Sequence, residues 1–246
     1  LIDPMLGPDS APISPATTPR FSKNTLALID DFPPIDLMLL THDHYDHLDY
    51  ASMKKLIPKI KNFYVALGCG RHLESWGVNA RSIQEFDWWD SAIFEGIKVT
   101  FTPSRHFSGR GLLDRAKSLW GGWVFDTSTE KLYHSGDGGY GKHFKEIGEK
   151  LGPFDLGFME CGQYGEKWHQ IHMFPEESIQ AALDAKVNLA TPYHWAGFKL
   201  ALHSWTEPAT DFVHQAKLKS VKYTLPKLGE LMSLNDVKTT EWWTNQ

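Results

Sequence analysis

Seven consecutive residues, Thr-His-Asp-His-Tyr-Asp-His at positions 41–47, place four potential metal ligands within six positions of the chain. They directly follow a short apolar run at 35–40, which begins after two prolines and predicts a buried strand. His42 and His44 are two residues apart, so in extended backbone both imidazoles point the same way. The last two residues of the motif follow in a turn and can face a second point nearby. The cluster therefore indicates a metal site at the carboxyl end of a strand.

The residue composition limits how such a site can be built. The 246 residues include 12 histidines but only two cysteines, Cys69 and Cys161, which disfavours a disulfide scaffold. A metal site must then use imidazole and carboxylate groups, which suit zinc and also iron or manganese. The net charge of −5 disfavours a nucleic-acid partner. No apolar run approaches the roughly 20 residues that span a bilayer, so we expect no transmembrane segment.

Short apolar runs alternate with helical patterns along the chain, without repeats, which predicts an α/β domain. Strands are predicted at 35–40, 63–67, 97–102, 155–159 and 189–193, with a hairpin formed by 118–125 and 131–134. Helices are predicted at 48–57, 143–150, from Pro175 to Leu183, and at 207–217. Residues 3–34, rich in Pro, Ser, Asp and Thr, are expected to be irregular.

Three further residues are candidates to complete the set of metal ligands, because each follows a predicted strand. They are His106, Asp137 and His194. A single histidine is more often a packing residue than a ligand, but the repeated pattern favours the three together. The glycines on both sides of Asp137, in Ser-Gly-Asp-Gly-Gly, allow the backbone to turn sharply and approach an ion closely.

The His-x-His-x-Asp-His run, with His106, the Gly-Asp-Gly element and the late His194, resembles the metallo-β-lactamase superfamily. Longer stretches are similar to the branch that contains N-acyl-phosphatidylethanolamine-hydrolysing phospholipase D and its bacterial relatives. They are THDHYDHLD, LWGGWVF, HSGDGGY, GPFDL, PEES and HWAGFKLALHSWTEP. The likeness extends from about residue 2 to residue 215, nearly the whole chain.

The resemblance implies an α/β fold of the metallo-β-lactamase type, an αββα four-layer sandwich. We expect one domain over residues 1–246, with its first strands missing upstream. The resemblance also implies two divalent metal ions, zinc in most members and iron or manganese in some. The expected ligands are His42, His44 and His106 for the first ion, Asp46, His47 and His194 for the second, and Asp137 bridging both. No expected ligand is absent.

Two such ions lower the pKa of a bridging water to about 7, so hydroxide is available at neutral pH. We therefore expect a metal-dependent hydrolase that acts on a phosphodiester, with Asp137 and Asp46 among its catalytic residues. A lactonase or another carbonyl hydrolase is an alternative, since the same hydroxide attacks both centres. A mononuclear iron sulfur dioxygenase of this superfamily is a second alternative, and a non-catalytic protein that keeps the metal for stability is a third. Cys161 is read as a small buried residue rather than a nucleophile.

The substrate side of the site is less defined by the sequence. The phospholipase branch has a histidine before the same Pro-Glu-Glu element, which implies that His172 contacts the substrate or donates a proton to the leaving group; helix capping is the alternative. Arg105 and Arg110 flank His106 and could hold a phosphate, or could be solvated loop charges, and the sequence favours neither interpretation. Trp195 lies beside a predicted ligand and could line an apolar pocket. We expect a small-molecule or lipid-like substrate.

The sequence says least about location and assembly. The chain starts with Leu1 and no methionine, so a signal peptide or lipid anchor upstream stays possible. Two cysteines fit a reducing compartment, and we expect a cytoplasmic rather than a periplasmic protein. Peripheral membrane contact stays open, and the sequence does not define the oligomeric state.

Overall fold

The structure, a computed structural model, describes residues 1–13, 15 and 18–245. The chain divides into two compact units. One consists of residues 1–90, 107–121 and 197–200, and the other of residues 91–106, 122–196 and 201–246. The single domain expected over residues 1–246 therefore stays a prediction.

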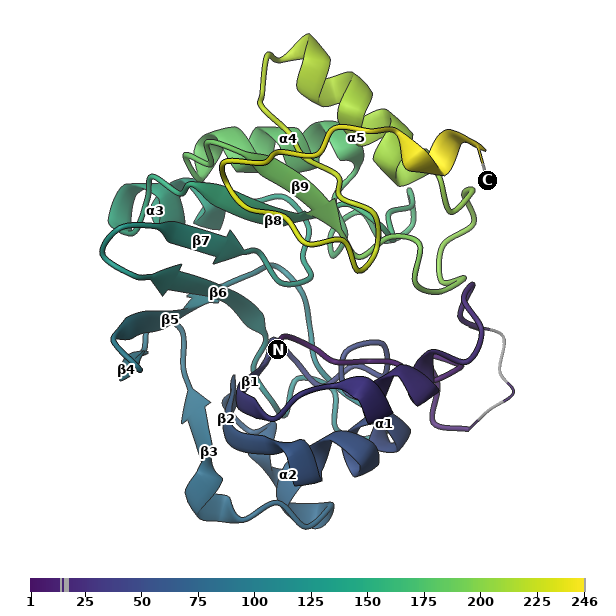
Figure 1. Cartoon of the computed structure of the whole chain (residues 1–246), viewed down its shortest axis with the longest axis vertical. Helices are drawn as coiled ribbons and strands as arrows, with labels where there is room; N and C mark the ends of the chain where they lie inside the picture. The colour runs from purple at the N-terminus through teal and green to yellow at the C-terminus, as the bar shows by residue number, and fades with distance from the viewer. Residues whose placement is uncertain (14, 16–17, 246) are drawn as a thin grey trace. The chain divides into compact units, whose positions relative to one another are not determined.

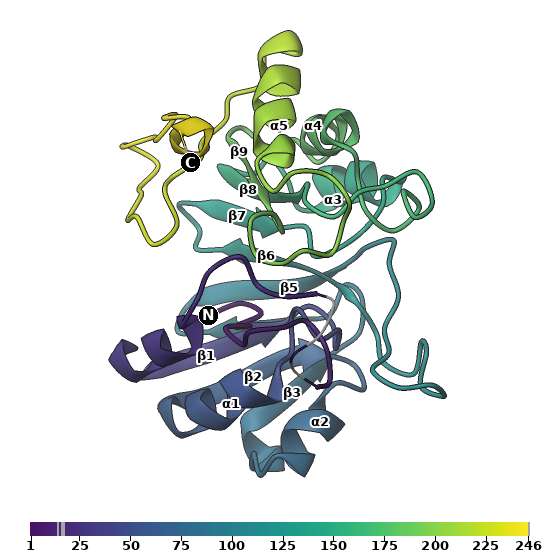
Figure 2. The same ribbon diagram turned by 90° about the vertical axis from the view of Figure 1, so that its right-hand side faces the viewer.

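The first unit is built on a parallel three-stranded sheet, with strand order β1-β2-β3 (Figures 1 and 2). Its elements are β1 (Ile35–Leu40), α1 (Tyr50–Leu56), β2 (Ile60–Ala66), α2 (Gly70–Ser75) and β3 (Ile83–Phe86), with short 3-10 helices at Thr25–Asp31, Ile57–Lys59 and Ala80–Ser82. Both crossovers run in the same direction along the sheet. Right-handed connections therefore place α1 and α2 on the same face.

Strand β1 ends where its apolar residues end. Met38 and Leu40 are fully buried, and the chain then turns through the polar motif at 41–47. Helix α1 starts after Asp49, whose carboxylate accepts hydrogen bonds from the backbone N–H groups of the first helical turn, including that of Ser52 at 2.8 Å. The motif is thus a short connection fixed at one end by a strand and at the other by a capped helix.

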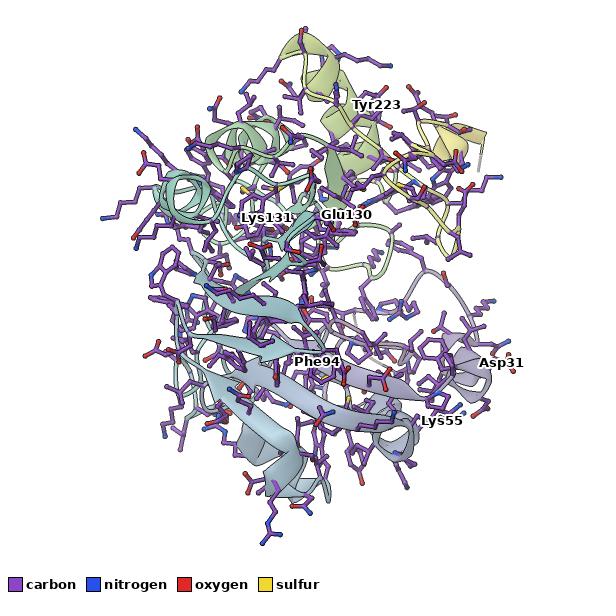
Figure 3. All side chains as sticks on the ribbon, turned by 60° about the vertical axis from the view of Figure 1, so that its left-hand side comes forward. Asp31, Lys55, Phe94, Glu130, Lys131 and Tyr223 are labelled. Atoms are coloured by element: carbon purple, nitrogen blue, oxygen red, sulfur yellow. The ribbon has the colours of Figure 1, made fainter. Side chains whose placement is uncertain are left out.

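The second unit is built on a six-stranded sheet whose strands follow one another in chain order (Figures 1 and 2). The strands are β4 (Ser91–Phe94), β5 (Ile97–Pro103), β6 (Gly121–Asp126), β7 (Lys131–His134), β8 (Leu156–Glu160) and β9 (Ala190–Tyr193). The helices are α3 (His143–Lys150), α4 (Pro175–Asp184) and α5 (Glu207–Leu218), with a 3-10 helix at Trp242–Asn245. Strands β6 and β7 form an antiparallel hairpin, with Glu130 and Lys131 at its turn (Figure 3).

Strands β7, β8 and β9 are parallel neighbours, so their carboxyl ends meet at one edge of the sheet. The chain leaves this edge toward Asp137 after β7, ends β8 with Glu160, and reaches His194 directly after β9. This topology collects three ionisable side chains from distant parts of the sequence. The core beneath them includes the stacked pair Tyr133 and Phe154, whose ring centroids are 5.1 Å apart.

Each predicted strand and helix is confirmed as an element of that type, with bounds that agree within a few residues. Strand β1 and helix α3 have the predicted bounds, and the hairpin of β6 and β7 forms across the expected turn. Helix α2 and strands β3 and β4 were not predicted. The 3-10 helix Thr25–Asp31 lies within residues 3–34, which were expected to be irregular. Of the helices in the described part of the chain, none is both long and apolar enough to span a bilayer.

Candidate metal centre

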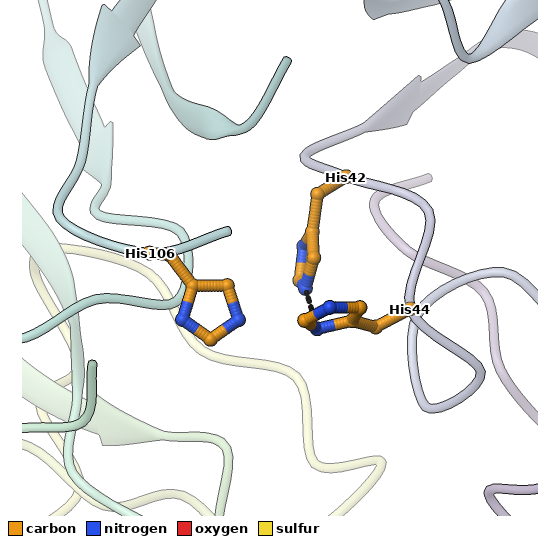
Figure 4. Close-up of side chains that lie close together, drawn as sticks. All are labelled: His42, His44 and His106. Atoms are coloured by element: carbon orange, nitrogen blue, oxygen red, sulfur yellow. Dashed lines mark hydrogen bonds between the residues drawn. The ribbon is translucent and has the colours of Figure 1, made fainter. Parts of the chain in front are cut away.

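The loop after β1 brings two of the predicted ligands together. The Nε2 atom of His42 lies 2.9 Å from Nδ1 of His44, and the His42 side chain is buried (Figure 4). Two ligands of one tetrahedral zinc ion, each about 2.0 Å from it, are roughly 3.3 Å apart. The nitrogen pair therefore fits two positions of one coordination shell. Figure 4 also draws His106, which belongs to the second unit.

The third histidine of the motif is oriented by a carboxylate near the start of the chain. Nδ1 of His47 donates to Oδ2 of Asp3 at 2.8 Å, and Thr41 donates its backbone N–H and its hydroxyl to the same carboxylate at 2.8 and 2.6 Å. With Nδ1 occupied in this way, Nε2 is the nitrogen left to bind a metal, and it lies 3.5 Å from a carboxylate oxygen of Asp46. A carboxylate behind a ligand histidine is the usual support of a metal site.

Asp43 lies between two predicted ligands in the sequence but points away into a network of its own. Its buried carboxylate accepts hydrogen bonds from the Gly109 backbone at 2.8 Å and the Ser118 hydroxyl at 2.5 Å, and it lies 3.2 Å from Nε2 of His72. Burial disfavours ionisation of Asp43, but these hydrogen bonds outweigh it and lower the pKa of the carboxyl to about 2. Asp43 thus ties the segment around residues 109–118 to the motif loop.

Arg110 belongs to the same network. Its Nη1 donates to the carbonyl oxygens of Asp43 and Leu48 at 2.7 and 2.6 Å, and its guanidinium lies 4.0 Å from the ring centroid of Tyr45. Through these contacts the guanidinium stabilises the backbone of the motif loop. Of the two arginines that flank His106, Arg110 therefore has a structural explanation that does not involve a phosphate.

In the second unit, Asp137 and His194 lie side by side at the edge of the sheet. Oδ2 of Asp137 is 3.2 Å from Nε2 of His194, and the Tyr193 hydroxyl donates to Oδ1 at 3.0 Å. Packing against the segment at Gln170 requires glycine in the turn that carries Asp137. At Gly139 an added Cβ would lie 2.2 Å from the carbonyl oxygen of Gln170, so only glycine fits.

Glu160, at the end of β8, has no exposed side-chain surface. Its Oε1 lies 3.1 Å from Nδ1 of His172 and 3.4 Å from Nδ1 of His194, and its Oε2 accepts from the backbone N–H of Met173 at 2.8 Å. Burial raises the pKa of Glu160, but the hydrogen bonds and charges of the two histidines outweigh burial and hold the pKa below its usual value. Glu160 is therefore a buried anion with two imidazole partners.

His106 and His172 are neighbours within the second unit, with ring centroids 5.1 Å apart. Nδ1 of His106 lies 3.1 Å from the carbonyl oxygen of Ile171, which fixes the ring on the segment that carries His172. Ligand atoms of His106, Asp137 and His172 lie within 4.8 Å of one another. The structure thus brings His172 close to two predicted metal ligands. Its role toward substrate stays a prediction.

The seven predicted ligands are distributed over both units. Four lie in the first unit (His42, His44, Asp46 and His47), and three lie in the second (His106, Asp137 and His194). All are buried or partly buried. Imidazole nitrogens and carboxylate oxygens in this combination fit zinc, iron or manganese. The assignment of each ligand to a particular ion stays a prediction.

The other predicted site residues have structural partners. Arg105 is exposed and donates to the Tyr140 carbonyl oxygen at 3.1 Å. Trp195 donates through Nε1 to the Pro192 carbonyl and stacks parallel to Trp205. Their roles toward substrate stay predictions. Cys161 is buried, and burial raises the pKa of its thiol well above the usual value, as expected for a packing residue.

Sequence reasoning missed both carboxylates that support the histidines, Asp3 and Glu160. Asp3 carries no local signal, because its partners lie 38 and 44 residues further along the chain. Glu160 does carry one. It ends the apolar strand Leu156–Glu160, and a charge in a buried strand requires partners.

Comparison with known proteins identifies the family of this fold. Residues 1–195 match the family model described as "Beta-lactamase superfamily domain". An uncharacterised protein of Mycobacterium tuberculosis is 39% identical over 86% of this chain and 58% of its own length. The N-acyl-phosphatidylethanolamine-hydrolyzing phospholipase D 1 of Caenorhabditis elegans is 29% identical over 85% of this chain and 63% of its own length. The chain thus spans about six-tenths of the length of these relatives.

Solved structures agree on the fold. The isothiocyanate hydrolase from Delia radicum gut bacteria superposes with a TM-score of 0.69 over 95% of this chain and 91% of its own, at 18% identity. At that identity the likeness shows the fold alone. Together with the family match, it confirms the predicted metallo-β-lactamase-type α/β fold.

Proposed function

The chain belongs to the metallo-β-lactamase superfamily, and we propose that it is a metal-dependent hydrolase that cleaves a phosphodiester bond. The observation that carries the proposal is the likeness to the Caenorhabditis elegans phospholipase D over 85% of this chain. All seven predicted ligand residues are also present in the sequence. The likeness supports the choice of phosphorus over carbon as the attacked centre. Metal chemistry is supported separately, by the histidine and aspartate pairs within each unit.

We propose that two divalent ions, zinc in the first instance, bind the seven predicted ligands. When bound, such ions act as Lewis acids and supply hydroxide at neutral pH. The protein's contribution is to orient each imidazole so that the correct ring nitrogen points toward the metal. Asp3 does this for His47, and Glu160 does it for His194.

His172 is the proposed proton donor to the leaving group. Its Nδ1 is bound to Glu160, so Nε2 is the nitrogen that can exchange a proton with substrate. Its ring lies beside that of His106, with centroids 5.1 Å apart, which places it next to a predicted ligand. A general acid must reach the departing oxygen directly or through one water, and a position beside the ligands meets that requirement.

A lipid-like substrate is supported by a cavity in the second unit. The cavity has a volume of about 360 Å³ and is lined mainly by aromatic and aliphatic side chains, including Tyr164, Trp168, Phe174 and Leu202. That size lies within the usual range of ligand pockets. Phe174 is two residues from His172, so an acyl chain in the cavity would start close to the proposed proton donor.

One experiment tests the proposal against its alternatives. The purified protein is analysed for metal content and then assayed with phosphodiesters and lactones, with and without a chelator. About two zinc or manganese ions per chain and chelator-sensitive phosphodiesterase activity support the proposal. Lactone cleavage alone supports the carbonyl hydrolase, and one iron per chain supports the sulfur dioxygenase. A fully loaded protein that is inactive on all substrates supports a non-catalytic metal protein.

A further inference from the structure

Glu160 contacts two histidines to which different roles are proposed. His194 is a predicted metal ligand, and His172 is the proposed proton donor. A single carboxylate oxygen, Oε1, lies within hydrogen-bonding distance of Nδ1 of both. The two rings are stacked, with an interplanar angle of 19° and centroids 5.5 Å apart.

The chemistry of a carboxylate decides the tautomer of both rings. An ionised carboxylate only accepts hydrogen bonds, so each Nδ1 that binds Oε1 must carry the hydrogen. In a neutral imidazole the lone pair then belongs to Nε2. His172 must therefore first take up a proton at Nε2, as an imidazolium paired with the Glu160 carboxylate, before it can donate that proton to a leaving group. The Nε2 atom of His194 faces Asp137 at 3.2 Å, on the side where a metal would bind.

Glu160 itself is held firmly. Its backbone N–H donates to the Ser135 hydroxyl at 3.0 Å, and its Oε2 accepts from the Met173 backbone at 2.8 Å. These contacts join β8 to the segment that precedes Asp137 and to the segment that carries His172. A displacement of Glu160 would therefore shift both imidazoles together.

We propose that Glu160 is a shared positioning residue, which locks His172 and His194 as Nδ1–H tautomers and couples the metal ligand to the substrate-side histidine. The roles of the two histidines rest on the proposed function, whereas the tautomers do not. In this proposal Glu160 acts through the two rings and is not itself a ligand of the metal or a contact of the substrate.

The test compares Glu160→Gln, which keeps the shape, and Glu160→Asp with the wild type. Glu177→Gln is the matched control, because Glu177 also accepts a backbone hydrogen bond in this unit, from Phe174 at 3.0 Å, without contacting an imidazole. Long-range nitrogen–proton NMR spectra of the metal-free protein report the tautomers. Competition with a chromogenic chelator reports metal affinity.

We expect Nδ1–H signals for both histidines in the wild type and their loss or mixing in Glu160→Gln. Metal affinity should fall 10–100-fold in Glu160→Gln, recover partly in Glu160→Asp, and stay unchanged in Glu177→Gln. In an active preparation, kcat should fall more than KM rises. The wild-type spectrum tests the proposal even if a variant fails to fold. An Nε2–H tautomer at either histidine in that spectrum would overturn the proposal.

Equal losses of affinity in Glu160→Gln and Glu177→Gln would also overturn the proposal, because they would indicate a general effect on folding. If the wild type binds metal and shows both Nδ1–H tautomers but cleaves no phosphodiester, the proposed function fails while the positioning role stands. The two failures are therefore distinguishable.

Discussion

The carboxylate of Asp3 lies 2.8 Å from Nδ1 of His47, although the two residues are 44 positions apart in the chain. The same carboxylate also binds Thr41, the residue that starts the motif loop. The first unit thus supports a predicted ligand in the way that Glu160 supports His194 in the second. In each unit a carboxylate thus lies behind a predicted ligand histidine, partly buried at Asp3 and fully buried at Glu160.

Replacing Asp3 with asparagine should lower metal affinity about 10–100-fold, because the amide no longer holds the His47 tautomer as an ionised acceptor does. Chelator competition measures this directly. Asp36→Asn is the control, since Asp36 is well exposed and pairs only with Lys61 among the ion pairs found for it. An affinity in Asp3→Asn equal to that of the control would show that Asp3 does not support the site.

Asp43 should make the stability of the metal-free protein depend on acidic pH. Its pKa of about 2 in the folded state lies below the ordinary 3.8, so the carboxylate stabilises the fold above about pH 4, and this contribution is lost as the pH falls toward 2. Asp43→Asn should therefore cost about 2 kcal/mol of unfolding free energy at pH 7 and less at pH 3. Urea titrations at both pH values measure the difference.

The matched control for this prediction is Asp31→Asn, which alters an exposed aspartate. It should leave the unfolding free energy unchanged at both pH values. If the difference in unfolding free energy between wild type and Asp43→Asn were as large at pH 3 as at pH 7, it would argue against the lowered pKa of Asp43.

The two arginines that flank His106 should behave differently. Arg110→Ala should reduce stability by roughly 1–3 kcal/mol, because two carbonyl hydrogen bonds and the contact with Tyr45 are lost. Arg105→Ala should leave stability unchanged and, if Arg105 binds phosphate, raise KM for a phosphodiester. Thermal unfolding and steady-state kinetics separate the two effects. An unchanged KM in Arg105→Ala would remove it from the substrate-binding residues.

Removal of the metal or of Asp137 should abolish hydrolysis. Dialysis against a chelator should bring activity to background, and zinc or manganese should restore it. Asp137→Ala should reduce kcat by at least about 10³-fold and lower the metal content of the purified protein, because one carboxylate ligand is lost. Undiminished activity in this variant would contradict the proposed ligand set.

The aromatic cavity should set a preference for chain length. Leu202 lines it and is 93% exposed, so Leu202→Glu places a charge at its rim. This variant should lower kcat/KM for long-chain substrates and leave that for short-chain ones unchanged. Leu183→Glu is the control, because Leu183 is also exposed but does not line the cavity. Equal losses for both chain lengths would rule out an acyl-binding role.

The fold could be predicted from the sequence where apolar runs end sharply. Strand β1 is bounded by prolines on one side and by the motif on the other, and α3 ends just before Gly152-Pro153. Helix α2 was missed because it has only six residues and starts at a glycine without a side-chain cap. Strand β4, Ser91–Phe94, alternates exposed and partly buried residues, so little apolar surface marks it.

Four of the seven candidate ligands could be predicted because they are local: three histidines and an aspartate in six residues. His106, Asp137 and His194 were predicted from their positions after strands and from the family resemblance. The supporting carboxylate of Asp3 could not be predicted, because its hydrogen bond with His47 depends on tertiary structure. Glu160 carries a local signal as a charge at the end of a buried strand, but its pairing with His194 also depends on tertiary structure. The sequence also left the roles of Arg105 and Arg110 equal. The structure distinguishes them, because Arg110 donates to two carbonyl oxygens and contacts the Tyr45 ring, whereas Arg105 is exposed.

The backbone at Gly162 limits how this protein can be redesigned. A Cβ built there would lie 1.6 Å from the carbonyl oxygen of His194, a clash with backbone that no side-chain rearrangement relieves. His194 itself has a φ of 69°, in the left-handed region, so its backbone cannot easily retreat. A library of variants aimed at new substrates should therefore hold position 162 constant and diversify residues such as Glu166 and Lys167, which line the cavity.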